Sequence, residues 1–287
     1  MSDISNPAPN KTTALYVVAT PLGNLGDITL RAVDILKQAD LIACEDTRHA
    51  RRLLDHYGIR TPTLAVHEHN EREAGEKLVA RLRQGQSVAL ISDAGTPAVS
   101  DPGARVVAAV QAAGFPVVPL PGANAAIAAL SASGLADEHF LFVGFLPPKP
   151  GPRRTQIAAL AAVPAALVFY EAPHRVEETV ADLVALLEPG RELVVARELT
   201  KLFEQIVRLP LAEAPAWFAA DDNRRRGEFV LIVSAPPPRT GLDDEAERVL
   251  KLLLAELPVK QAAKLAAAIT GQGRNALYQR ALELKDL

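Results

Sequence analysis

A loop in the middle of the chain brings together the residue types best suited to bind a ligand. Residues 91–103 read Ile-Ser-Asp-Ala-Gly-Thr-Pro-Ala-Val-Ser-Asp-Pro-Gly. An apolar run before them predicts a buried parallel strand, and an apolar helical pattern follows. Ligands of open α/β sheets bind at the carboxyl ends of strands, so the backbone N–H groups of Gly95 and Thr96 could hold an anionic group and Asp93 a cationic one. The alternative is a tight turn in which Asp101 caps the next helix.

Two more loops of the same kind occupy the first half of the chain. A predicted strand at 14–19 leads into the Pro- and Gly-containing loop 20–29, and one at 115–120 leads into 121–124 and an alanine-rich helix at 125–133. Three such loops are hard to explain as turns alone, because turns need not place glycine beside a helix start. None has the G-x-G-x-x-G or G-x-x-x-x-G-K-[ST] spacing, which argues against nicotinamide-binding and nucleoside triphosphate-binding enzymes.

Charged residues follow the predicted strand 40–44. Glu45 and Asp46 stand beside Arg48 and Arg51, so this segment could serve acid–base chemistry or contact a polyanion. The alternative is a capped helix start with solvated arginines.

The second half repeats the alternation of strands and helices. Strands are predicted at 165–170, 193–197, 203–209 and 227–234, and helices at 153–162, 175–187 and 211–220. Glu198 and Lys201 follow the second of these strands, with Glu204 nearby. Lys201 is a candidate general base or substrate clamp, and the alternative is a solvent-exposed ion pair.

The composition argues against several classes of protein. The 287 residues contain one cysteine, Cys44, which lies in an apolar run that predicts a core position and has no partner for an internal disulfide. His67 and His69 are two residues apart, which is not the spacing of a helical zinc pair, and we expect no metal site. We find no run of about eighteen apolar residues and no signal peptide, so we expect a cytoplasmic protein without membrane contact.

The length predicts two domains and a small appendage. We place an N-terminal α/β domain at 12–146, a second α/β domain at 153–235 and a helical appendage at 242–287, with a Pro-rich linker at 147–152. The formal net charge of the chain is −3, yet residues 259–285 hold five Lys or Arg against one acid. This local charge suits an RNA backbone, although the solvated face of a dimer-packing helix would look the same.

Six motifs together carry a family resemblance. They are residues 19–29, Glu45-Asp-Thr-Arg48, Ile91–Pro97 with Ser100–Gly103, Tyr170–Arg175, Ala196–Lys201 and Gly227-Glu-Phe229. Over about residues 12 to 284, the chain resembles the ribosomal RNA small subunit methyltransferase I family, within the tetrapyrrole methylase superfamily of class III methyltransferases. The resemblance implies two α/β domains with S-adenosylmethionine in the cleft between them and a homodimer. It also implies 2′-O-methylation of a cytidine in the decoding centre of 16S rRNA, in the small ribosomal subunit.

The same resemblance implies roles for individual residues. Those implied to bind the cofactor are Pro21, Leu22, Gly23, Asp93, Ala94, Gly95, Thr96, Val99, Asn124, Ala125, Tyr170, Glu171 and Leu199. At Asn124 the family often has a serine, so an amide contact here replaces a hydroxyl contact. We expect Glu45, Asp46, Glu198 and Lys201 around the acceptor hydroxyl, because methyl transfer to a weakly acidic group gains from a base or a nearby cation. Arg48, Arg51 and Arg175 are candidates for phosphate contacts.

Two other functions remain open at this point. One is a methyltransferase of the same superfamily that acts on a tetrapyrrole or on diphthine. The other is a ribosome-assembly binding module without turnover.

Overall fold

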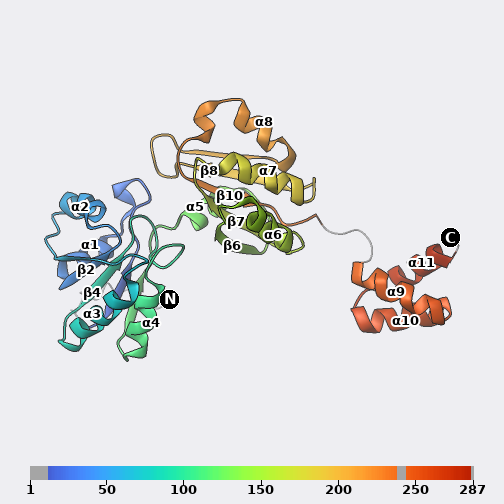
Figure 1. Cartoon of the computed structure of the whole chain (residues 1–287), viewed down its shortest axis with the longest axis horizontal. Coiled ribbons are helices and arrows are strands. Elements are labelled where there is room, and N and C mark those ends of the chain that lie inside the picture. The colour runs from blue at the N-terminus through green and yellow to red at the C-terminus, as the bar shows by residue number, and fades with distance from the viewer. Residues whose placement is uncertain (1–11, 238–243, 286–287) are drawn as a thin grey trace, which may run out of the picture. The chain divides into compact units, whose positions relative to one another are not determined.

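The computed structural model describes residues 12–237 and 244–285 (Figure 1). The chain divides after Ala235 into two compact units. The first unit contains two five-stranded sheets, and the second contains the C-terminal helices. Within the described ranges, we find no helix with the length and apolar character that crossing a membrane requires.

The first sheet is entirely parallel and has the strand order β3-β2-β4-β1-β5. Its strands are β1 (Leu15–Val18), β2 (Leu41–Cys44), β3 (Thr63–Ala65), β4 (Val88–Ile91) and β5 (Val117–Leu120). They include the strands predicted at 14–19, at 40–44, directly before residue 91 and at 115–120. β1 lies between β4 and β5, with Tyr16 opposite Ala89 and Val118. The three Gly- and Pro-containing loops therefore leave three adjacent strands at the same edge of the sheet.

Helices cover both faces of this sheet (Figure 1). α1 (Leu30–Gln38) and α2 (Thr47–His56) pack on one face, and α3 (Glu71–Arg83) and α4 (Ala104–Ala112) pack on the other. Both faces of the strands are buried, as expected of parallel strands, and Cys44 is 1% exposed in the predicted core position.

The second sheet is mixed and has the order β6-β7-β10-β8-β9. Its strands are β6 (Phe140–Phe145), β7 (Ala166–Glu171), β8 (Glu192–Arg197), β9 (Gln205–Pro210) and β10 (Phe229–Val233). β6 and β7 are parallel, whereas β10 is antiparallel to β7 and β8, and β9 is antiparallel to β8. α6 (Pro150–Leu160), α7 (Val176–Leu186) and α8 (Ala214–Ala219) pack on one face, while α5 (Ala125–Ala132) packs on the other.

The structure corrects the predicted organisation around residue 146. The predicted N-terminal domain ends at residue 146 and so includes β6, but β6 pairs with β7 in the second sheet. The predicted linker 147–152 is also too long, because α6 already begins at Pro150. Proline fits the first turn of a helix, where its missing N–H costs nothing, so a Pro-rich run can start a helix as well as separate two domains.

Two short 3₁₀ segments interrupt the predictions for residues 211–226. The predicted helix 211–220 begins as a 3₁₀ turn at Leu211–Glu213 before α8, and a second 3₁₀ turn follows it at Asp222–Arg225. Neither segment changes the order of the strands.

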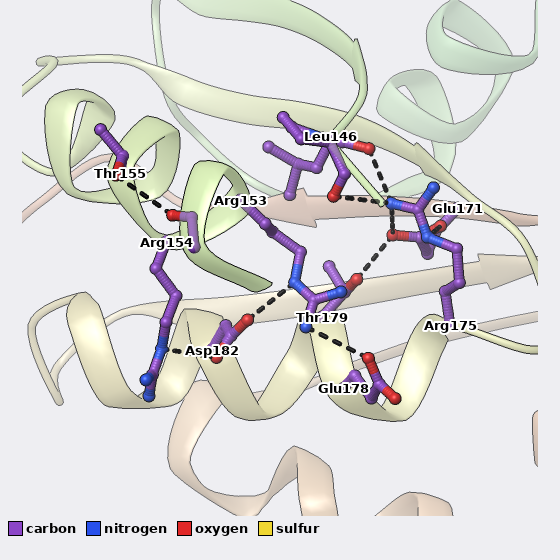
Figure 2. Close-up of polar contacts among 11 residues, drawn as sticks. Leu146, Arg153, Arg154, Thr155, Glu171, Arg175, Glu178, Thr179 and Asp182 are labelled. Carbon is purple, nitrogen blue, oxygen red and sulfur yellow. Dashed lines mark hydrogen bonds and ion pairs between the residues drawn. The ribbon is translucent and has the colours of Figure 1, made fainter. Parts of the chain in front are cut away.

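A buried ionic network joins α6 to α7 (Figure 2). Arg153 is 2% exposed, and its Nε donates to Asp182 Oδ2 at 2.7 Å. Its Nη2 donates to the exposed Glu178 at 3.3 Å, and Arg154 contacts Asp182 Oδ1 at 2.9 Å. Asp182 thus compensates a guanidinium charge that has little access to water.

The second unit consists of the predicted helices α9 (Asp244–Glu256), α10 (Val259–Thr270) and α11 (Arg274–Lys285). They share a small core that includes Leu250, Ala263 and Leu277. Gly271 adopts the left-handed conformation that ends α10, with φ 72°. The first two residues of the predicted appendage, 242–243, and its last two, 286–287, lie outside the described residues.

Candidate active site

One cavity of about 330 Å³ lies where loops of the first sheet meet the second sheet. Its lining includes ten of the residues predicted to bind a cofactor: Leu22, Ala94, Gly95, Thr96, Val99, Asn124, Ala125, Tyr170, Glu171 and Leu199. Three others, Pro21, Gly23 and Asp93, are not in the lining. The carboxylate of Asp93 faces the neighbouring loop, where it accepts the backbone N–H of Asp46 at 3.2 Å.

Hydrogen bonds tie the three loops of the first sheet together. Thr20 and Gly95 form an isolated bridge, with N···O distances of 2.8 and 2.9 Å. The Thr96 hydroxyl donates to the carbonyl of Ala123 at 2.9 Å, which joins the second loop to the third. The expectation that the Gly95 N–H could hold an anion is therefore wrong, because that N–H already donates to Thr20.

The loop between β4 and α4 has an unusual backbone. Ala98 and Ser100 have φ values of 65° and 61°, and Gly103 has 135°. Non-glycine residues rarely adopt the left-handed region, and such residues concentrate at functional sites. This loop delivers Asp101 to the wall of the cavity.

A distant carboxylate holds the end of this loop. Glu71 Oε1 accepts the backbone N–H groups of Gly103 and Arg105, both at 2.8 Å, and so caps α4 from the start of α3. The alternative interpretation of Asp101 as the helix cap is wrong, because Gly103 occupies the N-cap position. The Asp101 side chain therefore does not cap α4, and the residue lines the cavity.

Burial raises the pKa of Asp101 to about 6, and the negative charge of Asp93 adds to this effect, while a hydrogen bond with Ser92 partly offsets it. Burial also raises the pKa of Glu45, with further contributions from Asp93, Asp101 and Asp46. Acidic groups of two loops thus share one partly buried region at the end of the first sheet.

Asp46 is already engaged. Its carboxylate accepts the N–H of Arg48 at 2.8 Å as the cap of α2, and it also pairs with the Arg48 guanidinium at 2.8 Å. These hydrogen bonds hold the pKa of Asp46 well below its usual range. An acid in this state is a poor proton acceptor, which weakens its predicted catalytic role.

The loop after β8 forms the opposite side of the site. Glu198 and Thr200 have φ values of 50° and 66°. Lys201 Nζ donates to Glu198 at 2.9 Å and to Glu228, a lining residue, at 2.8 Å. Burial disfavours the charge of Lys201, but the two carboxylates outweigh it and raise its pKa. The ammonium therefore persists at neutral pH, so the geometry favours a clamp over a general base. Glu204 does not contact the ammonium, since its carboxylate accepts the Thr200 N–H at 2.5 Å.

Arg175 and Glu171 form an inward-facing network (Figure 2). The Arg175 side chain is 16% exposed, and its Nη2 donates to the carbonyl of Leu146 at 2.6 Å. Its Nε lies 3.3 Å from Glu171, which is fully buried and also accepts the Thr179 hydroxyl at 2.6 Å. This arrangement argues against the predicted phosphate contact of Arg175, since the guanidinium is occupied inside the protein.

Comparison with known proteins gives the family. Residues 14–215 match the model described as Tetrapyrrole (Corrin/Porphyrin) Methylases, and residues 240–285 match the RsmI C-terminal HTH domain. The chain is 54% identical over 272 residues to Ribosomal RNA small subunit methyltransferase I of Pseudomonas aeruginosa, an alignment covering 94% of this chain and 96% of the relative. This chain belongs to the ribosomal RNA small subunit methyltransferase I family. The Escherichia coli member is 50% identical over 277 residues, covering 96% and 97%.

Solved structures share the fold of this family member. The methyltransferase CobJ superposes with a TM-score of 0.59 at 21% identity, covering 79% of this chain and 97% of that one. A uroporphyrin-III C-methyltransferase from Thermus thermophilus, complexed with S-adenyl homocysteine, gives 0.54 at 21% identity, covering 77% and 97%. The predicted α/β fold of tetrapyrrole methylase type is therefore confirmed.

The cavity of this methyltransferase I family member has two chemical characters. Leu22, Val99 and Leu199 supply apolar surface, and the carboxylates of Asp101 and Glu228 supply negative charge, whereas no Lys or Arg of the described residues lines it. Such a lining suits a ligand with an apolar part and a cationic part. Among the same residues, no group of three His, Cys, Asp or Glu is placed to hold a metal ion.

Sequence reasoning assigned no site role to several lining residues, among them Ser100, Asp101, Phe145 and Glu228. A signal for two of them was present, since Asp101 lies in the central loop and Glu228 lies in the Gly227-Glu-Phe229 motif. What the sequence does not contain is the direction in which each side chain points.

Proposed function

We propose that this chain transfers a methyl group from S-adenosylmethionine to the 2′-oxygen of a cytidine ribose in the decoding centre of 16S rRNA, as a cytoplasmic homodimer. One observation carries the proposal. A single cavity combines loops from both sheets in a chain that is half identical, over nearly its whole length, to small-subunit rRNA methyltransferases.

The cavity lining fits this methyl donor. Leu22, Val99 and Leu199 would pack against the adenine and the methionine side chain, and the carboxylates of Asp101 and Glu228 would face the positive charges of the donor. When bound, S-adenosylmethionine supplies an electrophilic methyl group on a sulfonium.

The chain's own residues would position the acceptor. In-line transfer requires an aligned hydroxyl, so rigid loops contribute much of the rate. The Thr20–Gly95 bridge and the Glu71 cap fix two of these loops. Lys201 holds a positive charge beside Glu228 at the rim, where it can attract a phosphate or favour charge developing on the ribose oxygen.

Basic residues outside the cavity support an RNA substrate. Arg51 and Arg60 are exposed beside a hollow of about 310 Å³, and neither has an ion-pair partner among the described residues. Arg48 is exposed but is paired with Asp46, so a phosphate would compete with that carboxylate. In the second unit, Arg280 is paired with Glu247, which leaves Lys260 and Lys264 as better candidates for an RNA backbone.

The homodimer is supported by apolar side chains on an edge strand. Phe140 and Phe145 of β6 are 51% and 53% exposed, and β6 has a sheet neighbour only on its β7 side among the described residues. Exposed apolar side chains at a sheet edge favour burial against another chain. Light scattering of the purified chain tests this part of the proposal.

Ribose-methylation mapping tests the function. Small-subunit RNA from a strain lacking this chain should lose one 2′-O-methyl group, and the purified chain should restore it with labelled S-adenosylmethionine. Assembled subunits and naked 16S rRNA should be offered separately. Label transfer to a tetrapyrrole or to diphthine instead, or no binding of the donor by calorimetry, would contradict the proposal.

A further inference from the structure

The loop between β8 and β9 carries two apolar side chains that are exposed to solvent. Leu202 is 89% exposed and Phe203 is 68% exposed. Neither side chain belongs to a hydrophobic cluster of the described residues. We propose that Phe203 stacks on a base of the RNA that carries the acceptor ribose, and that it thereby helps to hold this RNA at the cavity. The inference rests on the proposed function, since it names a residue that binds the same substrate.

This loop leads from the wall of the cavity to the surface of the protein. Leu199 lines the cavity, and the ammonium of Lys201 donates to the lining residue Glu228 at 2.8 Å. Phe203 follows Leu199 by four residues, so the two Cα atoms lie at most about 15 Å apart. An RNA segment that places a ribose in the cavity would therefore pass within reach of Phe203.

Hydrogen bonds within the loop hold the backbone around Phe203. The Thr200 N–H donates to the carboxylate of Glu204 at 2.5 Å, and the Glu204 N–H donates to the carbonyl of Lys201 at 3.1 Å. Glu198 and Thr200 adopt the left-handed conformation, which persists only where surrounding contacts enforce it. Because the loop is fixed before the RNA arrives, stacking on its ring costs little conformational entropy.

Cations near the loop suit a nucleic acid. Lys201 holds its ammonium at the rim, and the exposed Arg226 has no ion-pair partner among the described residues. The Arg197 guanidinium donates to the carbonyl of Arg226 at 2.9 Å and to the side chain of Gln205 at 3.0 Å. It thus joins the segment of Arg226 to the strand that begins two residues after Phe203. Proteins bind unpaired bases and the phosphates between them with such aromatic rings and nearby cations.

The acids of the loop are engaged by groups of the chain itself. The Lys201 ammonium contacts Glu198 at 2.9 Å and Glu228 at 2.8 Å, and Glu204 accepts the Thr200 N–H. These contacts offset part of the negative charge that would repel a phosphate. Stacking of a base on the ring itself needs no charge.

The exposed ring lies apart from the strand to which we assign the homodimer. The strand order of the second sheet places β9 at one edge and β6, with Phe140 and Phe145, at the other. The proposed contact with RNA and the proposed contact with a second copy therefore fall at opposite edges of one sheet.

The test compares three replacements of Phe203 in the full chain with Leu30→Ala, which removes an 86% exposed leucine from α1. The kcat/KM for methylation of assembled small ribosomal subunits should fall about tenfold or more in Phe203→Ala, because one stacked base is lost. Phe203→Tyr keeps the ring and should stay within about threefold of the parental kcat/KM. Phe203→Leu keeps only the apolar character, so it should lose nearly as much as Phe203→Ala. Leu30→Ala should match the parental chain.

Two further measurements separate RNA binding from other roles of this side chain. Calorimetric affinity for S-adenosylhomocysteine should stay within about threefold of the parental value in every variant, which also shows that each variant folds. Light scattering should give the parental molar mass for every variant.

Several results would overturn the assignment. A parental kcat/KM in Phe203→Ala would show that the ring does not contact the RNA. Equal values for Phe203→Leu and Phe203→Tyr would indicate a general apolar contact instead of stacking. A loss of S-adenosylhomocysteine affinity as large as the loss of kcat/KM would place the ring over the donor, and a changed molar mass would place it against a second copy. A parental chain that methylates neither subunits nor naked 16S rRNA would instead contradict the proposed function.

Discussion

Gly23, in the loop after β1, lies directly beneath the side chain of Lys201, in the loop after β8. A Cβ on Gly23 would overlap Lys201 Cγ and would lie 3.0 Å from Cε. The lysine stem therefore crosses the glycine before its ammonium reaches Glu198 and Glu228. The absence of a side chain at position 23 is what lets the two loops meet at the cavity rim.

Gly23→Ala should displace Lys201 and lower the methylation rate about tenfold, which corresponds to about 1.4 kcal/mol. The clash disappears if the lysine is shortened, so Gly23→Ala should have little further effect in a Lys201→Ala background. A double-mutant cycle measured by single-turnover methylation reports this coupling. Gly151→Ala is the control, because a Cβ there would meet no atom within 4 Å. Additive effects would show that the contact is irrelevant.

Lys201→Met should abolish turnover yet keep donor affinity, because it removes a positive charge that two carboxylates hold at the rim. Lys201→Arg should retain part of the rate. Since the pKa of Lys201 is raised, titration of Lys201 should cause no change in the methylation rate between pH 7 and 9. Rates over this pH range and calorimetry with S-adenosylhomocysteine measure these effects. Parental single-turnover rates in Lys201→Met would refute a role in the chemical step.

Glu71→Ala should destabilise the fold by about 2–3 kcal/mol, because it leaves the N–H groups of Gly103 and Arg105 without the carboxylate that caps them. Glu73→Ala, on the exposed face of the same helix, should leave the melting temperature unchanged. Thermal unfolding followed by circular dichroism compares the two. Equal melting temperatures would mean that water replaces the cap.

Asp101→Asn should stabilise the chain at pH 7.5 but not at pH 4. The folded-state pKa of about 6 exceeds the ordinary value of 3.8, so the folded state binds more protons between these values and parental stability falls as pH rises through this window. The amide avoids the penalty of the buried charge. After allowance for solvent at this partly exposed site, we expect a gain of about 1 kcal/mol at pH 7.5. Thermal melts at both pH values check the sign.

Asp182→Ala should cost about 3–5 kcal/mol, because it strands the buried Arg153 charge between α6 and α7. Glu178→Ala removes the other carboxylate, which is 66% exposed, and should cost far less (Figure 2). Urea unfolding of the two variants separates these cases. Comparable losses would mean that Glu178 compensates the Arg153 charge as much as Asp182 does, in spite of its exposure.

The local sequence pattern predicted the helices and strands better than it predicted which strands pair with one another. The helix after Asp46 begins at the capped start that the sequence indicated, and this cap is observed. Asn124, which was predicted to contact the cofactor, also caps a helix, because its side chain accepts the N–H of Ile127. β6 was assigned to the wrong domain, because its pairing with β7 depends on a neighbour that periodicity does not reveal.

The candidate site shows the same division. Gly and Pro at strand ends indicated which loops surround the cavity, since those residues set the backbone path. The state of each side chain was not predictable in this way. Asp101 could be taken as a helix cap only because Glu71, thirty-two positions before Gly103, was not recognised as the residue that fills that role. The inward orientation of Arg175 was not predictable for a similar reason, since its acceptor, the Leu146 carbonyl, lies on another segment of the chain.

The placement of α5 and β6 bears on how such proteins are divided or recombined. Both follow the complete five-stranded parallel sheet in the chain, yet Ala126 and Ala129 pack with the second sheet and β6 forms its edge. A boundary for exchanging halves between relatives should therefore be placed between Leu120 and Asn124, before α5. A cut after Leu146 would leave the N-terminal fragment with an exposed alanine surface on α5 and with β6 unpaired. The C-terminal fragment would lack the helix and the edge strand that complete its sheet.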